Sequence, residues 1–251
     1  MKLLCLNTWG ARAGLEPLLR FFEKYQEIDI FCLQEIWNGG EHTIEAIAAG
    51  QRMSQVDFQL LRKIGSVLPQ HVPHFLPQYL DFFGMAIFAR KDLPVISEQR
   101  YPIYREPGYI SPDDIADHSR FLQMLTIQTG HGPLIVMHTH GAWQPGGKKD
   151  TPERLLQSEK IIEATRTAPH PAILCGDLNL SLDTESIHIL ERGGFRNLIR
   201  EFAIPSTRTS IYTKPERHAD YAFVSDGVDV QNFQVLPDEV SDHAALLLTF
   251  H

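Results

Sequence analysis

The chain has 251 residues, of which 43% are hydrophobic and 22% charged, a composition typical of a globular protein with room for one large domain. No stretch is long and apolar enough to predict a membrane span. The net charge is -8 and the basic residues are scattered, which weakens the case for a nuclease that grips long duplex DNA through its phosphates.

The N-terminal part of the sequence predicts a strand, a helix and a second strand. Lys2–Asn7 is predicted to be the first core strand, because its apolar part is too short for a signal peptide. Apolar residues then recur at helical spacing from Leu15 to Tyr25, and Asp29–Gln34 is a second apolar run. Residues 41–52 are predicted to form another helix. This order is typical of a layered α/β unit.

After Asp57 the sequence predicts short strands separated by turns that contain proline or glycine. The predicted strands are Phe58–Arg62, Met85–Phe88, Phe121–Ile127 and Leu134–His140. We expect the stretches around residues 63–83, 101–118, 142–150 and 205–217 to be loops, and loops of this kind choose the substrate on a shared fold.

The C-terminal half adds a capped helix and further strands. Asp150-Thr151-Pro152-Glu153 supplies a capping residue, an early proline and an early acid, so a helix is predicted from there to Thr167. The remaining predicted elements are strand Ala172–Cys175, helix 183–192, and strands Tyr221–Val224 and Ala244–Phe250. No repeat or linker interrupts the pattern. We therefore expect one continuous domain over residues 1–251, with two packed sheets and helices outside them.

All three cysteines lie inside predicted strands with apolar neighbours. Cys5, Cys32 and Cys175 are odd in number and lack the spacing of metal ligands, which indicates buried free thiols in a reducing compartment. The expected location is cytoplasmic.

Polar side chains that handle metals or protons stand where the apolar runs begin or end. These residues are Asn7, Glu35, His140, Asp177, Asp220 and His243. The first four follow their apolar runs and the last two precede theirs. If the last two strands run opposite to the other four, all six residues lie on one rim, where ligand sites of open α/β sheets form.

The residue types at this rim suit a hard metal ion and a phosphate. Mg²⁺, or Mn²⁺ in its place, prefers oxygen ligands, and Asn7, Glu35 and Asp242 offer them directly or through water. Asp177 and Asn179 are two residues apart and share a face in an extended chain. The carboxylate can orient or deprotonate a water while the amide holds a phosphate oxygen.

The last two rim residues are expected to act as a pair. His243 needs an orienting carboxylate if it is to donate to a phosphate or accept from water, and Asp220 is the candidate. His140 could be either a site residue or a structural histidine. A structural hydrogen-bonded pair is the alternative for Asp220 and His243.

These motifs, taken together, resemble the endonuclease/exonuclease/phosphatase superfamily, which includes deoxyribonuclease-I-like nucleases, sphingomyelinases and inositol-polyphosphate phosphatases. The matching segments are Leu6-Asn7-Thr8-Trp9, Leu33-Gln34-Glu35-Ile36-Trp37, Gly84-Met85-Ala86-Ile87-Phe88-Ala89-Arg90, Thr139-His140, Gly176-Asp177-Leu178-Asn179, Ala219-Asp220-Tyr221-Ala222-Phe223 and Ser241-Asp242-His243. They span nearly the whole chain in the family order. Each motif is weak alone, and together they are strong.

The resemblance implies an α/β (α+β) fold, a four-layer sandwich of two mixed sheets flanked by helices, and metal-dependent phosphoester hydrolysis. By the family pattern, Asn7 and Glu35 bind the metal. Asp177 positions the nucleophilic water, and Asn179 contacts the scissile phosphate. The resemblance also implies that Asp220 pairs with His243, which faces the phosphate. His140 stands where many members carry a second histidine.

The sequence departs from the family pattern at two places. His138 stands where asparagine is common, and Gly141 replaces a common apolar residue. Either change could alter the phosphate pocket.

Three functions remain open at this point. The first is a Mg²⁺- or Mn²⁺-dependent phosphodiesterase or nuclease, with a phosphomonoesterase acting on a small phosphorylated metabolite as its near rival. The second is a zinc-dependent hydrolase using His138 and His140, and the third is a catalytically silent binding module. The expected partner is a phosphate-ester substrate, with no obligate protein partner evident.

Several basic and aromatic residues near the motifs are expected to be structural. Arg120 is predicted to be exposed or salt-bridged, and contact with the phosphate is its alternative. Lys148 and Lys149 are predicted to belong to a mobile solvated loop, and a role in gripping the substrate is their alternative. His138 is expected to pack or support. Trp143 is expected to pack at the core or rim, and lining the pocket is its alternative.

Overall fold

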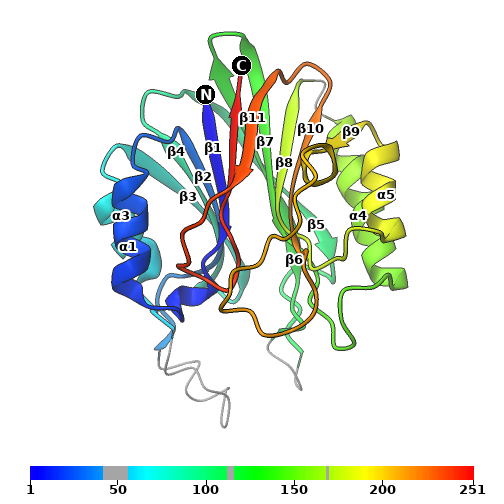
Figure 1. Ribbon diagram of the computed structural model, residues 1–251, viewed down its shortest axis with the longest axis horizontal. Coiled ribbons are helices and arrows are strands. Elements are labelled where there is room, and N and C mark those ends of the chain that lie inside the picture. The colour runs from blue at the N-terminus through cyan, green and yellow to red at the C-terminus, as the bar shows by residue number, and fades with distance from the viewer. Residues whose placement is uncertain (42–55, 112–115, 168–169) are drawn as a thin grey trace.

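Two sheets stacked face to face form the centre of the protein, and helices cover their outer faces (Figure 1). The computed structural model describes residues 1–41, 56–111, 116–167 and 170–251. The predicted sandwich of two mixed sheets flanked by helices is therefore confirmed. The helix predicted at 41–52 lies, apart from its first residue, outside the described residues.

The first sheet has the strand order β11-β12-β1-β2-β4-β3. Its strands are β1 (Lys2–Asn7), β2 (Ile30–Trp37), β3 (His71–Tyr79), β4 (Phe83–Arg90), β11 (Val230–Val235) and β12 (Leu246–Phe250). Strands β1 and β2 run parallel, and every other neighbouring pair is antiparallel.

The second sheet repeats this arrangement, with the order β5-β6-β7-β8-β10-β9. Its strands are β5 (Val95–Tyr104), β6 (Arg120–Thr129), β7 (Gly132–His140), β8 (Ala172–Asp177), β9 (Phe195–Asn197) and β10 (Asp220–Ser225). Here β7 and β8 form the parallel pair. The other neighbours are antiparallel.

Helices α1 (Leu15–Lys24) and α3 (Leu60–Val67) lie on one outer face, and α4 (Pro152–Arg166) and α5 (Glu185–Arg192) lie on the other (Figure 1). Two shorter helices are η1 (Trp9–Ala11) and α6 (Leu198–Glu201). As predicted, α4 starts at a capping residue: the Thr151 hydroxyl accepts a hydrogen bond from Arg154 N, and Pro152 occupies the first turn. No helix in the described part of the chain is long and apolar enough to cross a bilayer.

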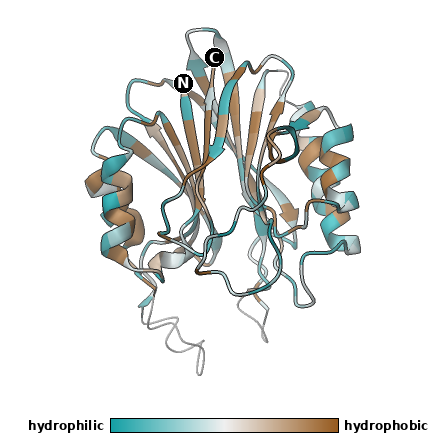
Figure 2. Cartoon of the chain, in the orientation of Figure 1, coloured by the Kyte–Doolittle hydropathy of each residue, from teal (hydrophilic) through white to brown (hydrophobic). Residues whose placement is uncertain are grey.

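Alternation along the strands builds separate hydrophobic layers. On β1, Leu3 and Cys5 pack into the layer shared with the second sheet, whereas Leu4 and Leu6 pack beneath α1 and α3. Figure 2 shows hydrophobic residues running along the strands of both sheets. The three cysteines are free and buried in the layer between the sheets, as predicted.

Three expectations from the sequence are wrong, and one of them is the loop expected at residues 101–118, whose first four residues belong to β5. The strand predicted at Phe58–Arg62 is instead a turn at residues 58–59 followed by the start of α3, because Leu60 and Ile64 stand four residues apart and both are buried on one helical face. Residues 63–83, expected to be a loop, contain the rest of α3 and all of β3. Strand β3 carries two prolines and lies at a sheet edge, so its sequence lacks a clean alternation.

Strand direction decides where the polar strand ends meet. Strand β10 runs antiparallel to β8, and β12 runs antiparallel to β1. Within the second sheet, residues that precede β10 therefore lie at the same edge as residues that follow β7 and β8, and within the first sheet the same holds for β12 with β1 and β2. The hydrogen bond from Asn7 to Asp177 brings the two edges together. The predicted convergence on one rim is confirmed at the level of topology.

A close approach of two strands adjoins this rim at Gly176. This glycine pairs with Thr139 of β7 and has a φ of 147°. A Cβ built there would lie 1.8 Å from the Thr139 carbonyl oxygen, which is a backbone atom and cannot rotate away. Glycine is thus required for β8 to pair with β7 immediately before Asp177.

We predict that Gly176→Ala lowers the free energy of unfolding by about 2–4 kcal/mol, because the strands must separate to admit the methyl group. Urea denaturation measures the effect. Gly130→Ala is the matched control, since a methyl group added at this glycine would have no atom within 4 Å and its φ is not positive. Equal stability of the two variants would contradict the close-approach argument.

Candidate active site

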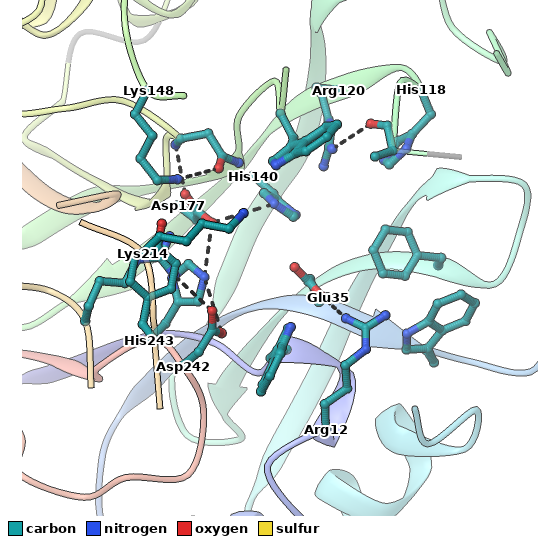
Figure 3. Close-up of a pocket in the computed structure, with 18 residues that line it drawn as sticks. Arg12, Glu35, His118, Arg120, His140, Lys148, Asp177, Lys214, Asp242 and His243 are labelled. Carbon is teal, nitrogen blue, oxygen red and sulfur yellow. Dashed lines mark hydrogen bonds and ion pairs between the residues drawn. The ribbon is translucent and has the colours of Figure 1, made fainter. Parts of the chain in front are cut away.

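A cavity of about 340 Å³ opens at the rim where the strand ends of both sheets meet. The predicted residues that line it are Glu35, His140, Asp177, Asn179, Asp242 and His243. The other two predicted site residues, Asn7 and Asp220, do not line the cavity, but each is hydrogen-bonded to a residue that does. Figure 3 shows the charged groups pointing toward a common space.

Glu35 reaches the cavity through a break in the sheet register. The pairing of β2 with β4 shifts between Gln34 and Ile36, and Glu35 has a φ of 56°. Such a bulge turns one side chain out of the regular alternation. Burial raises the pKa of the Glu35 carboxyl, opposed by the nearby Arg12, whose Nη1 lies 3.5 Å from Glu35 Oε2.

Asn7 connects the two carboxylates of the site. Its Nδ2 donates to Glu35 Oε1 at 3.2 Å and to Asp177 Oδ2 at 3.1 Å, so one amide bridges the two sheets. Its Oδ1 accepts from Trp9 N at 2.9 Å, which leaves one lone pair of this oxygen for another partner. Asn7 therefore orients both acids whether or not it also binds a cation.

Asp177 is the most heavily contacted acid of the cavity. Its Oδ1 accepts from Asn179 N at 2.8 Å, and its Oδ2 lies 3.8 Å from His140 Nε2 and 3.6 Å from His243 Nε2. Burial would raise the pKa of Asp177, but His243 and Lys148 outweigh burial and hold it well below its usual range. The carboxylate is therefore ionised at neutral pH and can accept a proton or orient a donor.

His243 and Asp220 form a tight buried pair. His243 Nδ1 lies 2.8 and 2.9 Å from the two carboxylate oxygens of Asp220, and Thr207 Oγ1 donates to Asp220 Oδ2 at 3.1 Å. Burial disfavours the imidazolium, yet the charges of Asp220 and Asp177 raise the pKa of His243 overall. With Nδ1 held by Asp220, Nε2 is the nitrogen that faces Asp177 and the cavity.

The two histidines at the end of β7 have different surroundings. His140 lines the cavity, and burial, reinforced by Arg120, keeps its pKa well below the usual value, so the ring is neutral. His138 does not line the cavity. It is fully buried with Nε2 only 2.5 Å from the Gln34 side-chain amide, which is the supporting position expected for it.

Several cavity residues were missed or misjudged from the sequence. Arg120 was expected to be exposed or salt-bridged, but it is 2% exposed and has no carboxylate within 4 Å among the described residues. Lys148 was assigned to a solvated loop, but it is 8% exposed and donates to Asn179 Oδ1 at 2.8 Å. Lys149 is exposed, as expected. Trp143 lines the cavity, which was its alternative interpretation.

Three further cationic residues line the cavity and were not predicted from the sequence. These are Arg12, Arg208 and Lys214. Arg208 Nη1 lies 3.3 Å from Asp242 Oδ2, and its guanidinium stacks 4.1 Å from the centre of the Tyr212 ring. A lone arginine or lysine in a loop carries no sequence pattern that predicts a place in a cavity wall, so the sequence could not single these residues out.

The loop that carries Lys148 is held by a buried arginine of α4. Arg154 is 2% exposed and donates to the backbone carbonyls of Ala142, Gly147 and Lys149 at 2.6–3.4 Å. These contacts fix the loop on both sides of Lys148. The position of the lysine is thus built into the fold.

The donor set of the cavity fits a hard divalent cation. Glu35 and Asp242 present carboxylate oxygens, and Asp242 Oδ1 is buried without a hydrogen-bond partner in the described part of the chain. Asp177, Asp220 and His243 also place ligand atoms within 4.8 Å of one another. In that second group His243 Nδ1 and Asp220 already bind each other, so Glu35 and Asp242 have the freer oxygens.

Comparison with known families identifies a match over most of the chain. The model described as "Endonuclease/Exonuclease/phosphatase family" matches residues 4–243. No match was found among curated protein sequences.

Solved structures share the fold at low sequence identity. A Bacteroides thetaiotaomicron mannosyl-6-phosphatase is 18% identical with a TM-score of 0.74, over 100% of this chain and 99% of that chain. An endonuclease/exonuclease/phosphatase from Bacteroides vulgatus is 15% identical with a TM-score of 0.72, over 100% and 98%. Humanized D. rerio TDP2 is 14% identical with a TM-score of 0.73, over 100% and 98%. At these identities the likeness establishes the fold.

We predict that His138 makes the protein sensitive to acid. Burial lowers the pKa of His138 to about 3, whereas an unfolded histidine titrates near pH 6.5. The unfolded state therefore binds the extra proton between these values, and stability is lost as the pH falls below about 6.5. Between pH 7 and pH 5 this histidine contributes about 2 kcal/mol of the loss.

Urea denaturation of the wild type and His138→Gln at pH 7 and pH 5 tests this expectation. The variant should lose about 2 kcal/mol less than the wild type over this interval. His131→Gln, at an exposed turn position, is the matched control. An equally steep loss in His138→Gln would show that the ring is not buried in its neutral form.

Proposed function

The chain belongs to the endonuclease/exonuclease/phosphatase family, and from this premise we propose that it is a phosphoester hydrolase that uses a divalent metal ion, Mg²⁺ or Mn²⁺. The observation that carries the proposal is the convergence of an ionised Asp177, the His243–Asp220 pair and the Glu35 carboxylate on one cavity. Hydrolysis of a phosphoester needs a group that positions water and groups that stabilise charge on the phosphate oxygens, and the side chains of this set are suited to both tasks.

The metal would be held by Glu35 and Asp242, with the amide oxygen of Asn7 as a third donor. When bound, it would supply positive charge to a phosphate oxygen. Oxygen ligands of this kind suit Mg²⁺ or Mn²⁺ better than zinc. His138 lies against Gln34 in the core and not in the cavity, which removes support from a zinc site shared with His140.

Asp177 is proposed to hold the attacking water. Its Oδ1 is engaged by Asn179 N, so Oδ2 is the oxygen that faces the two histidines and the cavity. As the water oxygen forms its bond to phosphorus, its proton passes to Asp177 Oδ2, and the bond from phosphorus to the ester oxygen breaks. The ester oxygen keeps the electron pair of that bond, takes a proton from solvent and leaves as an alcohol. Asn179, whose side-chain oxygen accepts a hydrogen bond from Lys148, is proposed to contact the phosphate.

The histidines are proposed to stabilise the phosphate. Asp220 fixes the tautomer of His243 and favours its charged form, so Nε2–H can donate to a phosphate oxygen. His140 is neutral and offers one N–H, and its Nδ1 has no partner among the described residues. The sequence favours a diester as the substrate, and a monoester is its rival. Either bond is cleaved by the same set of groups.

We predict that Asp177→Asn and His243→Gln each lower kcat/KM by about 10²–10⁴-fold, the usual contribution of a proton-transfer or charge-stabilising group. The assay uses purified protein with bis-p-nitrophenyl phosphate and p-nitrophenyl phosphate in Mg²⁺. Asp183→Asn is the matched control, because this carboxylate is 85% exposed and pairs with Arg200 away from the cavity. Full activity of both site variants would show that these motifs have no catalytic role and would contradict the proposal.

We predict that Glu35→Gln and Asp242→Asn raise the Mg²⁺ concentration needed for half-maximal activity by about tenfold or more, because each removes a charged oxygen donor. The measurement is a Mg²⁺ titration after treatment with EDTA, with Mn²⁺ and Zn²⁺ run in parallel. Asp183→Asn again serves as the control. Activity that survives EDTA, or that only Zn²⁺ restores, would overturn the assignment of the metal ligands.

A further inference from the structure

The cavity contains more fixed positive charges than its acids can neutralise. Among the described lining residues, Arg12 is paired with Glu35 and Arg208 with Asp242, while Asp177 and Asp220 face His243. Two buried cations remain, Lys148 and Arg120, and no ion pair to a described carboxylate satisfies either of them. This surplus stands against a net charge of -8 for the whole chain.

Lys148 stabilises the charge of Asp177 from a distance, yet no protein carboxylate is paired with its ammonium group in the described part of the chain, so the group can also bind an anion. Its ammonium group has three N–H donors, and the Asn179 amide oxygen takes one of them. The side chain is 8% exposed on the cavity wall, and Arg154 fixes the loop that carries it. A buried ammonium with donors to spare is costly unless a charged ligand pairs with it.

Arg120 is the corresponding group on another part of the wall. Its guanidinium donates to the Ala116 carbonyl at 3.1 Å and weakly to Gln78 Oε1 at 3.5 Å, and Nε has no partner in the described part of the chain. Burial lowers its pKa to about 10, so the group is still charged at neutral pH. Figure 3 places His140 between Lys148 and Arg120.

We propose that these two surplus cations select a terminal phosphate with two negative charges, so that the substrate is a phosphomonoester of a small molecule and not a diester. This inference rests on the proposed function and narrows its substrate. Glu35 and Asp242 are paired with Arg12 and Arg208 and would also hold the metal, which leaves Lys148 and Arg120 for the phosphate itself. A monoester is mostly dianionic at pH 7.5, because its second pKa is near 6, whereas a diester carries one charge.

The shape of the cavity fits a compact leaving group. Its volume of about 340 Å³ lies at the small end of the range for small-molecule sites. Aromatic side chains supply much of the wall, and they are Trp9, Trp37, Phe83, Trp143 and Tyr212. Ring-shaped groups such as a sugar or a nucleoside pack well against aromatic faces, so a phosphorylated metabolite of that size is the class of ligand that we assign.

The test compares p-nitrophenyl phosphate with bis-p-nitrophenyl phosphate in Mg²⁺ at pH 7.5. The two esters release the same leaving group but differ in the charge on phosphorus. The measured quantity is the ratio of kcat/KM for the monoester to that for the diester, in the wild type, Lys148→Met and Arg120→Gln. Because both values come from one sample, the ratio is independent of the fraction of protein that is folded. Lys149→Met is the matched control on the same loop.

We expect the wild type to prefer the monoester, and each of the two site variants to lower the ratio by about tenfold or more, the effect of one charge-assisted hydrogen bond. Lys149→Met should leave the ratio unchanged. Faster hydrolysis of the diester by the wild type, or an unchanged ratio in both site variants, would overturn the inference and leave the proposed hydrolase intact.

A different result would show that the proposed function itself is wrong. If neither ester is hydrolysed with Mg²⁺ or Mn²⁺, the hydrolase proposal falls. Binding of inorganic phosphate, followed by the fluorescence of Trp9 and Trp143 on the cavity wall, then decides about the anion site. A dissociation constant raised about tenfold in Lys148→Met but not in Lys149→Met supports the site, and phosphate binding that is equal in both variants overturns it.

Discussion

A carboxylate buried between two sheets is the constraint on which the arrangement of this protein depends. Asp177 is 2% exposed and ionised, and a charge in such a place is stable only if donors and opposite charges surround it. Asn7 donates to it from the first sheet, while Asn179 N, His243 and Lys148 surround it from loops that follow or precede strands of the second sheet and β12. The two sheets are therefore joined at this edge by polar contacts around Asp177, and further in by apolar packing together with a few polar contacts such as Gln34–His138 and Gln123–His74.

The same contacts give the groups of the site their different protonation states. Asp220 stabilises the charged form of His243, while burial and Arg120 keep His140 neutral, although the two rings lie at similar distances from Asp177. Burial raises the pKa of Glu35 and is outweighed at Asp177. The two acids thus differ from each other in pKa, and so do the two histidines, because their neighbours differ, and this suits them to different roles.

Local charge and overall charge have opposite signs in this protein. The chain is acidic overall, yet the cavity gathers arginine and lysine side chains from β6 and from loops far apart in the sequence. A cavity with low-dielectric walls concentrates their field on a small volume. An acidic outer surface around a basic cavity favours a compact anion over a long polyanion, and the net charge of the sequence reveals only the outer part of this arrangement.

The sequence by itself determined the strand ends, the chemistry of the motifs and the layered fold. Polar residues that follow buried apolar runs, such as Asn7 and Asp177, are local signals, and parallel or antiparallel pairing then brings them to one edge. The sequence could not show that a helix would begin within Phe58–Arg62, because a short apolar run is compatible with the spacing of a helix and with that of a strand. Only the tertiary structure decided the burial of Lys148 and Arg120, since both depend on contacts with chain segments that are distant in sequence, such as Asn179 and Gln78.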